Sequence, residues 1–141
     1  MGAFESGIRA DARGLVRTVD SFSRKIALDV FKRVILKTPV DTGCARNGWL
    51  CSISAPVVEM ARGEDWFQGQ SVGGYDKSGR AAIEAAAFEV VAWEPAKVAI
   101  YLTNNLPYIQ RLEDGYSGQS PSGMVEITLA EFDGIVARIA G

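Results

Sequence analysis

The chain of 141 residues contains no histidine. Histidine is the commonest general base and a frequent metal ligand, so its absence removes much acid–base and metal chemistry. The cysteines have no further soft ligands at Cys-x-x-Cys spacing. The stretch from Gly69 to Gly74 lacks the lysine of a phosphate-binding loop. The sequence therefore predicts no catalytic residue, no metal site and no cofactor.

The chain has only two cysteines, Cys44 and Cys51, seven positions apart. That spacing corresponds to about 23 Å along a strand or about 10 Å along a helix. Neither fits the ~4.4–6.8 Å between the Cα atoms of a disulfide, unless a tight loop brings the two residues together. We expect two reduced, structural thiols, as in a protein of the cytosol.

Long apolar runs are also missing. No segment approaches the ~20 apolar residues of a membrane span, and residues 1–20 lack the apolar core of a secretory signal. Hydrophobic residues make up 48% of the chain and charged residues 23%, which is ordinary globular composition. At this length a single domain over residues 1–141 can bury an adequate core.

The charge is unevenly distributed. Residues 1–37 hold eight basic and four acidic residues, a net charge of +4, whereas the remainder has a net charge of −6. A basic arm on an acidic body can contact nucleic acid or an acidic neighbouring copy of the same protein. Acidic residues interrupt the basic ones and no aromatic residues interleave, which favours self-association.

Apolar residues at spacings of three and four predict a long helix over residues 15–37, which Pro39 ends. Residues 1–14 contain glycines and are expected to form a flexible extension. Similar patterns predict helices over residues 78–93 and 124–139. Residues 49–54 alternate in the manner of a strand, and residues 98–103 are rich in β-branched and aromatic residues, which predicts a second strand. Glycine-rich or polar stretches predict mobile loops over residues 59–79 and 116–123. The expected fold is α+β, with a long N-terminal helix and a C-terminal helix packed on a small antiparallel sheet.

The turn after the first helix has a clear local chemistry. Pro39 ends the helix, Asp41 can accept bonds from the backbone two residues on or pair with Arg46, and Gly43 supplies a positive φ. On these grounds alone the segment is a helix-to-strand turn. Arg46 is expected to pair either with the body of its own chain or with a neighbouring subunit.

Two segments, taken in order, resemble a known family. They are Thr38-Pro39-Val40-Asp41-Thr42-Gly43 with Ala45-Arg46-Asn47-Gly48-Trp49, and Thr103-Asn104-Asn105-Leu106-Pro107-Tyr108-Ile109-Gln110-Arg111-Leu112-Glu113-Asp114-Gly115. Together with the long basic helix before them and a helix after them, they resemble the tail-completion, or head–tail joining, proteins of tailed bacteriophages. The resemblance covers roughly residues 15–139. Cys44 and the long 59–79 segment depart from the family pattern.

The resemblance implies a structural virion protein without enzymatic activity. Such a protein forms a ring in the neck and contacts the portal-side connector and the tail-tube or terminator proteins. DNA passes through its channel without sequence-specific binding, and the protein resides in the host cytoplasm before assembly. The alternatives are a tail terminator or head-closure protein, a nucleic-acid-binding regulator that uses the basic N-terminal helix, and a small hydrolase that relies on carboxylates.

Candidate interface residues follow from these arguments. On the first helix, the basic residues would meet an acidic neighbouring copy, and the exposed-looking aromatic pair of the 59–79 segment would dock on a partner. The remaining candidates lie in the two motifs. The full set is Arg24, Lys25, Lys32, Arg33, Asp41, Arg46, Trp66, Phe67, Glu113 and Asp114.

Overall fold

The computed structural model describes residues 2–39, 44–58, 77–115 and 123–141. One helix, α1 (Ala3–Lys37), dominates the molecule, and its 35 residues span about 52 Å. The helix ends where Pro39 predicts, and its C-cap residue Thr38 is already in an extended conformation. The end predicted from the sequence is thus confirmed.

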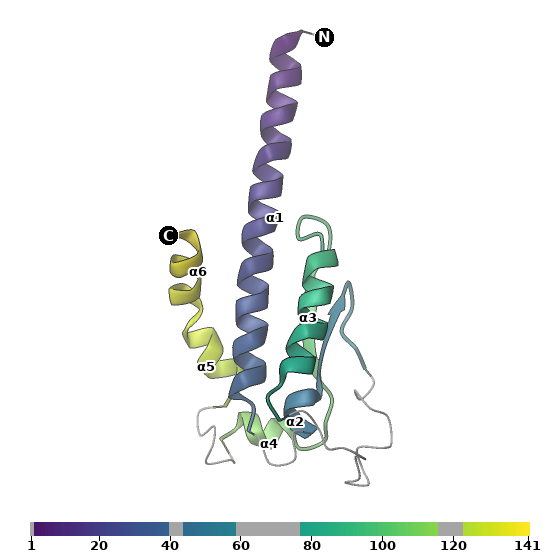
Figure 1. Ribbon diagram of the computed structural model, residues 1–141, viewed down its shortest axis with the longest axis vertical. Coiled ribbons are helices and arrows are strands. Elements are labelled where there is room, and N and C mark those ends of the chain that lie inside the picture. The colour runs from purple at the N-terminus through teal and green to yellow at the C-terminus, as the bar shows by residue number, and fades with distance from the viewer. Residues whose placement is uncertain (1, 40–43, 59–76, 116–122) are drawn as a thin grey trace.

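The start of α1 corrects the sequence prediction. Residues 1–14 were expected to be a flexible extension, but the helix begins at Ala3. Its first turns carry an i,i+4 ion pair in which Arg9 Nη2 lies 3.1 Å from Glu5 Oε1. The N-terminal half projects beyond the rest of the molecule (Figure 1), and its side chains from 2 to 19 are exposed except for the half-buried Glu5. We call residues 3–19 the arm.

The body packs against the other half of α1. Helix α3 (Arg80–Ala92) lies on one side of α1, and α5 (Val125–Ala130) and α6 (Phe132–Ala140) lie on the other (Figure 1). Strands β1 (Trp49–Ile53) and β2 (Ile100–Asn104) form a two-stranded antiparallel sheet with Trp49 opposite Asn104. Two short helices, α2 (Cys44–Asn47) and α4 (Ile109–Glu113), lie at the end of the body away from the arm. The α+β fold class is confirmed.

The core lies where α1, α3 and β1 meet the start of α5. Its buried members come from all of these segments: Val34, Ile35, Trp49, Ala82 and Met124. Alanine on the inner face of α3 allows the close approach of α1. The core is built on the last turns of α1, so the first turns contribute nothing to it.

The C-terminal helix is the second correction. One helix was expected over residues 124–139, but α5 ends at Ala130 and α6 begins at Phe132. Between them, Glu131 has φ −86° and ψ −5°, and its carboxylate is held by Arg33 and Lys37 of α1. The interruption lets both short helices follow the surface of α1.

Candidate interface surfaces

Two residues of the first motif, Thr38 and Arg46, form hydrogen bonds at the C-terminal end of α1. Thr38 is fully buried, and its hydroxyl donates to the Val34 carbonyl at 2.8 Å. The same hydroxyl accepts the indole N–H of Trp49 at 2.7 Å. Arg46 donates to three backbone carbonyls, those of Leu36, Thr38 and residue 77, at 2.8–3.2 Å. Arg46 therefore ties the turn to its own chain, which is the first of its two predicted roles.

The second motif is bonded directly to the first. The Asn104 side chain donates to the Ala45 carbonyl at 2.9 Å and accepts the Leu106 backbone N–H at 3.2 Å. A Cβ on Gly48 would lie 2.7 Å from the Leu106 side chain and 2.9 Å from Asn104 Oδ1, so a larger residue would displace these two side chains. The two sequence motifs thus form one structural joint at the end of the body.

Glu113 caps a helix distant in the sequence. Its carboxylate accepts the backbone N–H groups of residues 124, 125 and 126 at 2.8–3.0 Å, which are the first donors of α5. Gly123 has φ +79°, and a Cβ there would lie 2.6 Å from Glu113 Oε2. From the sequence, Glu113 could cap a helix, pair with an arginine or bind a partner, and the structure shows the first of these roles. The neighbouring Asp114 is exposed and accepts the Gln110 amide at 3.1 Å.

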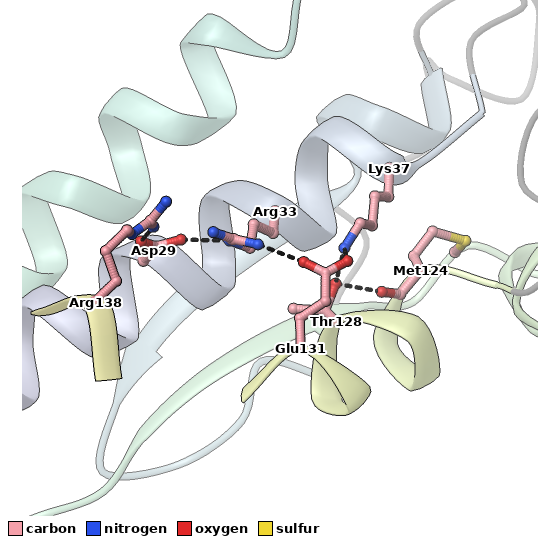
Figure 2. Close-up of polar contacts among 7 residues, drawn as sticks. All are labelled: Asp29, Arg33, Lys37, Met124, Thr128, Glu131 and Arg138. Atoms are coloured by element: carbon pink, nitrogen blue, oxygen red, sulfur yellow. Dashed lines mark hydrogen bonds and ion pairs between the residues drawn. The ribbon is translucent and has the colours of Figure 1, made fainter. Parts of the chain in front are cut away.

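A charged seam joins α1 to the two C-terminal helices (Figure 2). On α1, the carboxylate of Asp29 accepts a hydrogen bond from Arg33 Nε at 2.6 Å and also forms an ion pair with Arg138 of α6. Arg33 and Lys37 both bind the carboxylate of Glu131. These bonds hold the pKa of Glu131 below its ordinary value, the hydrogen bond from Lys37 being the largest cause. Burial raises the pKa of Asp29, but Arg33 and Arg138 outweigh it and leave that pKa lowered as well.

Beside the seam, an open groove of about 570 Å³ lies between α1 and α6. Leu28, Leu36 and Ile139 provide apolar lining, while Lys25 and Lys32 are exposed at its edge. Asp29, Arg33 and Arg138 complete the lining, which therefore has four basic residues and one acidic residue. The groove can accept an apolar side chain whose neighbours carry negative charge.

Two further apolar surfaces face solvent. Along the arm, the exposed apolar side chains are Phe4, Ile8, Leu15, Val16 and Val19. On the outer side of α3, Phe88 is 76% and Val91 is 78% exposed. Scattered apolar residues on a surface are ordinary, but groups of this kind along a helix mark contact sites.

The predicted interface residues divide into three groups. The first group forms bonds within the chain: Arg24, which donates to the Trp93 carbonyl at 2.8 Å, together with Arg33, Arg46 and Glu113. Lys25 and Lys32 come together at the groove, and Asp114 remains on the surface. The other predicted residues, Asp41, Trp66 and Phe67, lie outside the described residues.

Sequence reasoning missed the groove, the arm and the outer face of α3. The arm carried a usable signal, because Phe4 and Ile8 continue the helical spacing of the apolar stripe upstream of Leu15. The groove carried none, because α6 contributes to it through a tertiary contact with α1.

Other chemistry is sparse in the part of the chain that the structure describes. It contains no group of three His, Cys, Asp or Glu side chains that could hold a metal ion. Cys51 is a free thiol, and burial, followed by the charge of Glu89, raises its pKa to about 11. Within the described ranges, no helix has the length and apolar character to cross a membrane. No protein-family model, curated protein or solved structure matches the chain.

Proposed function

We propose that the chain is a structural virion protein of a tailed phage, a tail-completion or head–tail joining protein that forms a ring in the neck. The observation that carries the proposal is the joint between the two motifs. Residues that are far apart in the sequence, Ala45 and Asn104, are hydrogen-bonded, and Trp49 pairs with Asn104 in the sheet. The resemblance therefore rests on one continuous structural unit, whose parts depend on each other.

The absence of enzymatic activity belongs to the same proposal. Three polar residues in the described part of the motifs are engaged in structural bonds: Thr38 with Trp49, Arg46 with backbone carbonyls, and Glu113 with the start of α5. A carboxylate that accepts three backbone N–H groups is held as a cap and is poorly placed to exchange protons with a substrate. This supports a role in which the motifs maintain shape and other surfaces make contacts.

Ring formation is supported by two different kinds of exposed surface on the chain. The chain presents a basic groove and exposed apolar helical faces on different sides of α1. A contact between two different surfaces repeats from copy to copy, and it closes into a ring when the rotation permits. Of the four predicted basic interface residues on α1, Lys25 and Lys32 are available for such a contact, because Arg24 and Arg33 are already bonded within the chain.

Electron microscopy of purified virions, with each protein band identified by mass, tests the proposal. We expect the chain in the particles, located in the neck between the head connector and the tail tube. Particles made without it should accumulate as filled heads and separate tails. Its absence from virions, or normal joining of heads and tails without it, would contradict the proposal.

A further inference from the structure

Helix α3 is apolar on both sides. Its inner face, with Ala82, Ala86 and Val90, is buried against the body. Its outer face carries Phe88 and Val91, which remain more than three-quarters exposed, flanked by the exposed alanines 85 and 92. Large apolar side chains grouped on the exposed face of a helix are typical of a contact surface, which is the composition of this outer face.

The groove between α1 and α6 has the complementary chemistry. Its lining offers Leu28, Leu36 and Ile139 to an apolar side chain. Its two arginines are already paired with Asp29 and Glu131, so its two lysines supply the positive charge. Lys25 and Lys32 are exposed at this surface, and neither forms an ion pair among the described residues. A partner with an aromatic anchor and nearby carboxylates would satisfy both features.

The outer face of α3 fits this description in size and charge. Its 13 residues extend about 20 Å, and the groove runs along α1 from Lys25 to Leu36, about 17 Å. Glu84 lies one turn before Phe88 on this face, whereas Glu89 lies toward Cys51 of β1, so Glu84 is the carboxylate that can meet a lysine of the groove. Glu84 is paired with Arg80, but both side chains are largely exposed, and an exposed i,i+4 pair is weak enough to exchange for a lysine.

We infer that the outer face of α3 in one copy packs into the α1–α6 groove of the next copy, with Phe88 as the anchor. Figure 1 shows α3 and α6 on opposite sides of α1, so the two surfaces of one copy cannot meet each other. Each copy therefore contacts one neighbour through its α3 face and the other neighbour through its groove, which is the head-to-tail arrangement that builds rings. This inference rests on the proposed function only for its ring; the contact itself is a property of the isolated chain.

Sedimentation of the full-length chain over a range of concentrations tests the contact. We expect the wild type to form multimers, and Phe88→Glu and Val91→Glu each to weaken the association by about tenfold or more, as at interface anchors. Lys25→Glu/Lys32→Glu should weaken it through the opposite surface. Val58→Glu is the matched control, because Val58 is 87% exposed and lies on neither surface. Circular dichroism verifies that each variant keeps its fold.

Mixing two defective variants identifies the arrangement. The Phe88→Glu variant keeps its groove, and the Lys25→Glu/Lys32→Glu variant keeps its α3 face. At concentrations where neither variant associates alone, a mixture should therefore form a one-to-one complex that does not grow further. A contact between two like surfaces would produce no such complex and would overturn the inference.

The remaining outcomes are equally decisive. A wild type that stays monomeric at every concentration overturns the inference, as does assembly that Phe88→Glu weakens no more than Val58→Glu. If the chain is found in the neck of virions while these variants still assemble, the proposed function stands and this interface fails. If the mixture behaves as expected but the chain is absent from virions, the interface stands and the phage function fails.

Discussion

The cap that Glu113 places on α5 gives the sharpest prediction of stability. An ordinary N-cap side chain accepts one backbone N–H, and its removal costs about 0.5–2 kcal/mol. Glu113 accepts three, at 2.8–3.0 Å, and places a negative charge at the helix N-terminus, where an anion adds about 0.3–1 kcal/mol. We therefore expect Glu113→Ala to lower the free energy of unfolding by about 2–4 kcal/mol.

Glu113→Gln separates charge from shape. The amide keeps one oxygen acceptor, but its NH₂ group faces a backbone donor, so at least one bond is lost together with the charge. We expect a loss of about 1–2 kcal/mol for this variant. Asp114→Asn is the matched control, since that neighbouring carboxylate is exposed and bonds only an exposed glutamine amide among the contacts described. Its effect should stay below about 0.5 kcal/mol, as for other surface substitutions.

Urea denaturation followed by circular dichroism measures all three variants. The expected order of midpoints is wild type and Asp114→Asn together, then Glu113→Gln, then Glu113→Ala, with unchanged slopes. Equal midpoints for Glu113→Ala and Asp114→Asn would refute the assignment of the cap. Gly123→Ala gives an independent check: its side chain would collide with Glu113 and require a positive φ, so it should destabilise as well.

Four other perturbations follow from the structure. Thr38→Val should cost about 1–3 kcal/mol because it leaves the buried Trp49 indole N–H without an acceptor, and a double-mutant cycle with Trp49→Phe should show coupling. The pKa of Glu131 is lowered in the folded state, so the stabilisation by its carboxylate is present above pH ~4.5 and is lost as the pH falls through the folded pKa. The difference in unfolding free energy between the wild type and Glu131→Gln should therefore shrink as the pH is lowered below ~4.5. Cys51, with a pKa of about 11, should be labelled by a thiol reagent at pH 8 far more slowly in the native protein than in urea. Deletion of residues 2–19 should leave the thermal midpoint of the body nearly unchanged, because their side chains lie outside the core; a large drop would contradict this.

The local elements were predictable because their causes are local. The end of α1 follows from Pro39, β1 follows from the alternation of its residues, and β2 follows from its β-branched and aromatic composition. The glycines near the N-terminus predict a flexible extension, whereas α1 begins at Ala3. Phe4 and Ile8 keep the apolar spacing of the helix through this segment, so the sequence does contain a local signal for the longer helix.

The break between α5 and α6 has a different origin. Glu131 is pulled toward Arg33, which lies 98 positions away in the sequence. Likewise, Glu113 caps a helix that begins a dozen residues later, whereas capping rules consider the residue next to the helix. No local pattern encodes either contact, since both depend on how the C-terminal helices lie on α1.

The candidate interfaces show why charge alone was an insufficient guide to a contact surface. The four basic residues Arg24, Lys25, Lys32 and Arg33 look equivalent in the sequence, yet Arg24 and Arg33 are engaged within the chain. The tertiary structure assigns these two to internal bonds and leaves the two lysines beside an apolar groove. A basic residue next to apolar surface favours a specific docking partner, because apolar burial supplies affinity while charge selects the orientation. This distinction argues for a protein partner over nonspecific contact with DNA, whose affinity would come mainly from phosphate contacts.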